Sequence, residues 1–254
     1  MPRNNKTSLV QKIASQAYVT FPNCSTSAIG DNKTFLERQA ELVTLLSSIR
    51  AADLRIAPPK KVSISSSQSS AVPPVTYMHI CETDVFSMGV FLLKSGASIP
   101  LHDHPGMNGM LKVLYGKVNI RCYDKLDKSA GAESDTERQF DPPLMPFQGD
   151  DVRRAVLRSS GQFSPQSGPC ILSPLKDNLH EIDAVDGPAA FLDILAPPYD
   201  PDNGRDCHYY KVLQTCKKSE QSGEDEAWLL EIPQPEDFWC GGDPHPSQKF
   251  SVKR

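Results

Sequence analysis

The sequence predicts a mainly β protein, either a sandwich or a barrel, with two helices ahead of it in the chain. From residue 75 onward, short apolar runs are divided by Gly, Pro and Asp, a pattern typical of successive strands. Before residue 60, apolar residues recur at helical spacing instead. The chain has 22 prolines against 15 glycines, which favours loops and short strands over long helices. At 254 residues, one large domain can accommodate all of these elements.

Two helices are expected, within residues 8–21 and 31–54, and together they form an N-terminal helical extension over residues 1–60. In the second segment, five apolar side chains lie at helical spacing, and Asp31 can act as the N-cap. We expect both helices to pack on the outside of the β domain. A Ser- and Pro-rich stretch at 61–74 is expected to be a linker or a surface loop.

The β domain is expected to span residues 75–254. A polar insertion at about 124–151 is poor in aliphatic residues and is expected to lie outside the core. A second exposed loop is expected at 217–225. The expected strands lie within residues 75–82, 86–96, 110–124, 169–175, 180–199, 207–213 and 227–232.

Charge and composition exclude several classes of protein. A net charge of −4 and a pI near 5.9 provide no basic surface for nucleic acid or for an anionic membrane. Charges interrupt the longest apolar stretches well before the roughly 20 residues of a membrane-spanning helix, so we expect a soluble protein. The seven cysteines include no close CxxC pair, and no secretory signal precedes them, which indicates free thiols in a reducing compartment. We expect a cytoplasmic monomer, with the nucleus and the mitochondrion as open alternatives for its location.

Two histidines, His102 and His104, lie one residue apart and are followed by a dozen residues without a carboxylate. If residues 99–104 form a strand, both imidazoles point to one face and can bind one metal ion, while Asp103 points to the other face. The best candidate for a third ligand is His180, which begins another expected strand after a turn-like sequence. The histidines without a comparable pairing are His79, His208 and His245.

The first histidine pair has the spacing of a known motif. Gly96, His102, His104 and Gly116 fit the first cupin motif, G-x5-H-x-H-x(3,4)-E-x6-G, with Gly109 in place of the glutamate. Together with LHEIDAVDGPAAFLDILAPPY and CHYYKV further along, the sequence resembles the thiol dioxygenase family of the cupin superfamily, which includes cysteamine (2-aminoethanethiol) dioxygenases and plant cysteine oxidases. The resemblance covers about residues 75–240. It implies a cupin-type double-stranded β-helix, or jelly-roll, barrel.

The resemblance implies that His102, His104 and His180 hold Fe(II). Most mononuclear iron oxygenases use two histidines and one carboxylate, whereas three neutral imidazoles leave the full +2 charge on the metal, which favours an anionic thiolate. The implied reaction adds both atoms of dioxygen to sulfur. It converts cysteamine to hypotaurine, or the N-terminal cysteine of a protein to a sulfinate that has no general route back. Because dioxygen is consumed, the resemblance also implies oxygen sensing through the Arg branch of the N-degron pathway.

Four further residues are candidates for the active site. Asp193 lies in an apolar run, so it either accepts from a ligand histidine, meets the substrate amine, or faces solvent at a strand edge. Tyr199 either offers its hydroxyl to the pocket or packs at a strand end. Cys207 and Tyr209 share a face if their segment is a strand. The resemblance leaves two alternatives for this pair: a thioether cross-link, which has been proposed for the family, or two side chains that are not linked. No arginine is placed near the histidine motifs by the sequence, which favours a substrate without a carboxylate.

Two other functions are compatible with the same residues. A three-histidine cupin that binds zinc, nickel or manganese can catalyse hydrolysis or isomerisation through a metal-bound water. Alternatively, the domain is a binding or scaffold module with a vestigial metal site, to which the serine-rich and acidic loops contribute partner contacts. Iron with thiol-dependent oxygen uptake would distinguish the dioxygenase from the first alternative, and loss of function in His102→Ala would distinguish it from the second.

Overall fold

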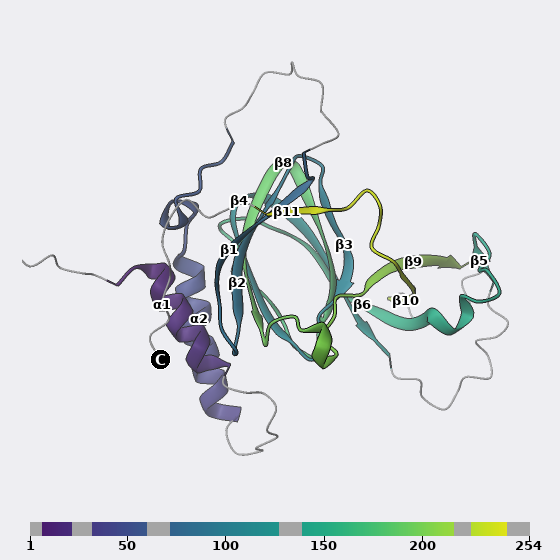
Figure 1. The fold of residues 1–254 in the computed structure, drawn as a ribbon, viewed down its shortest axis with the longest axis horizontal. Helices are drawn as coiled ribbons and strands as arrows, with labels where there is room; N and C mark the ends of the chain where they lie inside the picture. Colours follow the sequence, from purple (N-terminus) through teal and green to yellow (C-terminus); the bar gives the residue numbers. More distant parts are fainter. Residues whose placement is uncertain (1–6, 22–31, 60–71, 127–138, 216–224, 243–254) are drawn as a thin grey trace, which may run out of the picture.

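The computed structural model describes residues 7–21, 32–59, 72–126, 139–215 and 225–242 (Figure 1), and the structural statements below concern these residues. Two helices lead the chain, α1 (Leu9–Thr20) and α2 (Asn32–Ser48). Short 3-10 turns occur at η1 (Ala51–Leu54), η3 (Gly149–Asp151) and η4 (Pro201–Asn203). The strands are β1 (Val75–Glu82), β2 (Ser87–Leu93), β3 (Ser98–Asp103), β4 (Asn108–Lys125), β5 (Phe140–Asp141), β6 (Val152–Phe163), β7 (Cys170–Leu172), β8 (Leu179–Ala196), β9 (Tyr209–Thr215), β10 (Glu226–Ile232) and β11 (Cys240–Gly242).

The strands close into a barrel. Pairings run from β8 through β3, β9, β10, β6 and β4 and return to β8. Each of these pairings is antiparallel. On the other side of β8, the sheet continues through β2 and β1 to β11, while β7 pairs with β4 and β5 pairs with β9. Closure removes the free edges that an open sheet would expose, and it confirms the mainly β barrel that the sequence predicts.

The two longest strands, β4 and β8, are each 18 residues long, and each contributes to both walls of the barrel. The start of β8 pairs with β3, whereas its end pairs with β2. Between these halves the β4–β8 register is interrupted around Tyr115, and Gly116 and Gly187 adopt positive φ values of 73° and 141°. Figure 1 shows β8 bending over the barrel there, so that its two halves lie in opposite walls. Residues near its two ends therefore face a common interior.

Gly116 is required at this bend for two reasons. Its φ of +73° is a conformation that L side chains rarely adopt, and a Cβ added to it would lie 2.3 Å from the Pro188 carbonyl oxygen. Because backbone surrounds the position, neither neighbour can move aside cheaply. We expect Gly116→Ala to lower the free energy of unfolding by about 3 kcal/mol, measured by chemical denaturation. Gly149→Ala, where an added Cβ meets nothing within 4 Å, should stay within about 0.5 kcal/mol of the parent protein; equal losses would refute the steric account.

The helices cover the outer face of the sheet beside β1 and β2 (Figure 1). Ile13, Leu42 and Leu46 are fully buried and share one apolar cluster with Met88 and Leu192 from the sheet. Burial of each such side chain contributes roughly 1.5–3 kcal/mol. This packing confirms that the N-terminal helices lie outside the barrel. A second apolar cluster fills the barrel interior, with Val75, Leu111, Val113, Ile120 and Phe191 among its members.

Several expected boundaries differ from those in the structure. The segment expected as one helix over 31–54 is α2 followed by the separate turn η1. The expected strand over 207–213 begins only at Tyr209, so Cys207 precedes it. The expected N-cap Asp31, most of the 61–74 segment and most of the 217–225 loop lie outside the described residues. None of the helices in the described ranges combines the length and the apolar character that crossing a membrane requires.

Candidate metal centre

Three histidines from two strands meet inside the barrel. His102 and His104 lie at and just beyond the end of β3, and His180 lies at the start of β8, where it pairs directly with His102. The three ring centroids are 4.7 to 4.8 Å apart. One ligand nitrogen from each ring lies within 4.8 Å of the other two. The three side chains that the sequence nominates as metal ligands therefore converge.

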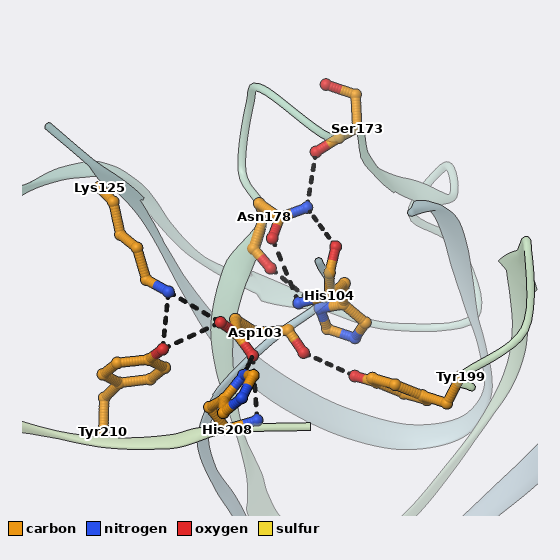
Figure 2. Close-up of polar contacts among 8 residues, drawn as sticks. All are labelled: Asp103, His104, Lys125, Ser173, Asn178, Tyr199, His208 and Tyr210. Atoms are coloured by element: carbon orange, nitrogen blue, oxygen red, sulfur yellow. Dashed lines mark hydrogen bonds and ion pairs between the residues drawn. The ribbon is translucent and has the colours of Figure 1, made fainter. Parts of the chain in front are cut away.

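Hydrogen bonds to the backbone fix which ring nitrogen faces the centre. His102 Nδ1 is 2.8 Å from the carbonyl oxygen of Pro100, and His104 Nδ1 is 2.9 Å from that of Asn178. A carbonyl only accepts, so each Nδ1 carries the proton and donates it, which leaves the Nε2 lone pair free. The Asn178 side chain also accepts from the His104 amide and donates to the His104 carbonyl (Figure 2). This is the usual support of a metal-binding imidazole.

The three imidazoles are held neutral. Burial lowers the pKa of His104 to about 3, with further lowering from neighbouring His102. Burial also lowers the pKa of His102, and it lowers that of His180 well below its ordinary value. Neutral imidazole is the form that binds a metal. The described donor set is entirely nitrogen and carries no charge, which suits zinc, copper, iron or nickel more than calcium or magnesium.

Asp103, between the two β3 histidines, forms the hub of a polar network on the other face of the strand (Figure 2). Its side chain is 4% exposed. Lys125 and Tyr210 donate to Oδ2 at 2.8 and 2.9 Å, and the backbone amide of His208 donates to Oδ1 at 3.0 Å. Burial alone would raise the pKa of Asp103, but these donors hold it below its ordinary value. The network ties β3 to β4 and β9 directly beside the histidines.

Asp193 lies inside the barrel, in the half of β8 opposite His180. It pairs with Gly89 on β2 and with Leu111 on β4, and its side chain borders a pocket of about 480 Å³. Burial raises the pKa of Asp193 to about 7, against a lowering by the Ile194 amide. The sequence analysis left open whether Asp193 faces the site or the solvent. In the structure its carboxylate lies in the wall of a pocket and not at a solvent-facing strand edge.

Tyr199, Cys207 and Tyr209 lie together near the histidines. Tyr199 borders the pocket, its ring centroid is 5.7 Å from that of His104, and its hydroxyl donates to the Asp103 carbonyl at 2.7 Å. The Cys207 thiol interacts by hydrogen bonds with both tyrosines, and burial raises its pKa to about 11. Cys207 and Tyr209 are therefore close enough to touch although Cys207 lies before β9. Their cross-link stays a prediction.

Sequence reasoning missed the residues that support the ligands. The sequence predicts only that Asp103 faces away from the metal, and it places Asn178 in the turn-like segment before His180. For Asp103 the signal was available, because a carboxylate on the buried opposite face of a strand needs partners. For Asn178 there was none beyond its place two residues before His180. His79, which has no neighbouring histidine in the sequence, borders the same pocket as Asp193.

Comparison with known proteins agrees with this geometry. The family model described as PCO_ADO matches residues 45–250. The chain is 56% identical to 2-aminoethanethiol dioxygenase from Mus musculus over 255 residues, which cover 98% of this chain and 99% of the mouse protein. It is 53% identical to the Homo sapiens protein of the same name over 269 residues, again covering 98% and 99%. Plant cysteine oxidase 1 from Arabidopsis thaliana is 30% identical over 203 residues, covering 75% of this chain and 64% of the plant protein. The chain therefore belongs to the PCO_ADO family and is an oxidoreductase of the dioxygenase class.

Proposed function

We propose that this protein is an Fe(II)-dependent dioxygenase for thiols that carry an amine two carbons from sulfur. Its substrates are cysteamine, which gives hypotaurine, and the N-terminal cysteine of peptides and proteins, which gives cysteine sulfinate. The relatives at 53 to 56% identity, named for 2-aminoethanethiol, support the first substrate. The plant cysteine oxidase at 30% identity supports the second. In both reactions the two atoms of dioxygen are transferred to one sulfur, so no external reductant is needed.

The neutral histidine triad supports this chemistry. Iron held by His102, His104 and His180 would keep its full +2 charge, and it would supply the centre at which thiol and dioxygen react. The residues fit such an ion because both Nδ1 atoms of the β3 pair are already engaged with carbonyls. Buried Tyr199, whose pKa is raised well above its ordinary value by burial, keeps its proton and its bond to the Asp103 carbonyl.

The observation that carries the proposal is the pocket that Tyr199 connects to the triad: Tyr199 borders the pocket, and its ring centroid is 5.7 Å from that of His104. Asp193 contributes a carboxylate to its wall, which can meet the substrate ammonium, and the described lining contains no lysine or arginine that would bind a substrate carboxylate. Free cysteine is therefore a poorer fit than cysteamine or a peptide N-terminus. The pocket volume of about 480 Å³ also exceeds the volume of cysteamine. Cysteamine has four non-hydrogen atoms, and at about 30 Å³ for each, the volume of one water molecule, it occupies about 120 Å³. The remaining space fits the residues that follow an N-terminal cysteine.

Oxygen sensing is the cellular role that we propose for the peptide reaction. Dioxygen is a co-substrate, so the rate of sulfinate formation follows its supply, and the product has no general route back to the thiol. Proteins marked in this way would enter the Arg branch of the N-degron pathway.

The test is incubation of the iron-loaded protein with oxygen and a short peptide that begins with cysteine, followed by mass spectrometry. We expect a gain of about 32 Da on the cysteine, the mass of two oxygen atoms at the sulfinate level. The N-acetylated peptide should stay unmodified because it lacks the ammonium that Asp193 meets. Equal oxidation of both peptides would contradict the amine requirement, and stoichiometric zinc without oxygen uptake would favour a hydrolytic cupin.

A further inference from the structure

The pocket that Asp193 and Tyr199 border is also lined by residues at the end of β1 and the start of β2, and a second carboxylate is among them. Glu82, at the end of β1, pairs with Ser87 on β2, and Ser87 pairs with Leu195 on β8. Leu195 is two residues after Asp193, so both point to the same face of β8. Glu82, Ser87 and Leu195 all border the pocket. The Glu82 carboxylate therefore belongs to the same pocket wall as Asp193.

A β-bulge is what turns Glu82 toward the pocket. The β1–β2 register shifts between His79 and Cys81, where β1 has one residue more than its partner. Without this extra residue, strict alternation would point Glu82 to the opposite face from His79. With the bulge, Met78 and Cys81 are buried in the apolar cluster under the helices, whereas His79 and Glu82 lie on the other face. Bulges commonly re-aim side chains beside active sites, and this one brings both His79 and Glu82 to the pocket.

Glu82 is available to a ligand. It is exposed, and in the described part of the chain no hydrogen bond or ion pair engages its carboxylate. The pocket lining there holds two carboxylates, of Glu82 and Asp193, and neither lysine nor arginine. The electrostatic field of these groups favours a ligand with positive charge at two positions and disfavours an acidic one.

We propose that Glu82 makes the enzyme select peptides whose residue after the N-terminal cysteine is lysine or arginine. The inference rests on the proposed function, because it places the N-terminal ammonium at Asp193. Glu82 lies two strands across and two residues along from Asp193, a separation of about 12 Å at regular sheet spacing. One peptide step of about 3.8 Å followed by the long stem of a basic side chain spans most of this distance.

The proposal is tested with three peptides that are identical except for lysine, alanine or glutamate after the N-terminal cysteine. For the parent protein we expect kcat/KM to fall in that order, with a lysine-to-glutamate ratio of roughly fivefold to tenfold, the size of one or two solvent-exposed charge interactions. In Glu82→Gln the ratio should fall to about two or less, and in Glu82→Lys it should invert. Because the lysine-to-glutamate ratio compares two peptides on the same enzyme sample, a variant that is partly inactive still gives the correct ratio. It should also shrink as salt is added.

Asp84→Asn is the matched control, because Asp84 is an exposed acid in the same turn that does not border the pocket. This variant should keep the parent ratio. Equal kcat/KM for the three peptides, or a ratio that persists in Glu82→Gln, would overturn the assignment of Glu82 while leaving the proposed function intact. If cysteamine is oxidised but none of the peptides is, the peptide part of the proposed function fails and the role of Glu82 fails with it.

Discussion

Replacement of His180 by alanine is expected to abolish iron binding and thiol oxidation together. The ligand nitrogen of His180 lies within 4.8 Å of those of His102 and His104. These three histidines are the whole donor set among the described residues. Removal of a residue that merely supports a ligand typically costs 10- to 100-fold in metal affinity, so removal of a ligand should cost more than about 100-fold. We expect a loss of at least that size in kcat/KM for cysteamine, with iron per chain measured by elemental analysis on the same samples.

His79→Ala is the control for the metal content. His79 borders the pocket but lies outside the triad, so its variant should retain about one iron per chain. Thermal unfolding should show that the His180 variant remains folded, because alanine removes a polar group from an apolar barrel and leaves no charge behind. Iron retained at the parent level in His180→Ala would mean that the triad is not the metal site.

Replacement of Asp103 by alanine is expected to give the largest loss of stability among the polar residues of the site. The carboxylate is 4% exposed and is engaged by Lys125, His208 and Tyr210. Breaking a buried ion pair costs about 3–5 kcal/mol. Lys125 and His208 are 38% and 39% exposed and can regain water, so we expect the lower end, about 3 kcal/mol in the free energy of unfolding. Because the network supports both β3 histidines, iron affinity should also fall by about 10- to 100-fold.

The pH dependence provides a second readout for Asp103. Its pKa is lower in the folded state than its ordinary value of 3.8, so its stabilising contribution is complete above that value and is lost as the pH falls through the folded pKa. Asp103→Asn should flatten this acid branch of stability. Asp186→Asn, at a side chain that is 75% exposed and 3.6 Å from Lys117, should change neither stability nor iron affinity by more than about 0.5 kcal/mol. An Asp103 variant as stable as the parent would contradict the network's role.

The apolar strands and the ligand triad could be predicted from the sequence because their signals are local. The run 75–82 is a short, mostly apolar segment between turn-like sequences, and its bounds are those of β1. The two β3 histidines are separated by one residue, so strand geometry alone brings them together. In contrast, the sequence does not predict β6, because Arg153, Arg154 and Arg158 interrupt its apolar residues.

Ion pairs explain why such a polar strand is stable. Arg154 lies 2.9 Å from Glu226 on β10, and Arg158 lies 2.8 Å from Asp124 on β4. These partners come from distant parts of the chain. The same holds for Asp103, whose partners Lys125, His208 and Tyr210 lie 22, 105 and 107 residues away. A pattern within one segment cannot reveal such contacts, and neither can it reveal the bulge that turns Glu82 into the pocket, because the bulge exists only in the pairing with β2.

The central claim is that three neutral histidines hold an iron at which both atoms of dioxygen are transferred to one sulfur. The most direct measurement is turnover of cysteamine by the iron-loaded protein under ¹⁸O₂, with the product weighed by mass spectrometry. The account predicts hypotaurine in which both sulfinate oxygens are ¹⁸O. A product with oxygen from water, or thiol consumption that yields only disulfide, would contradict it.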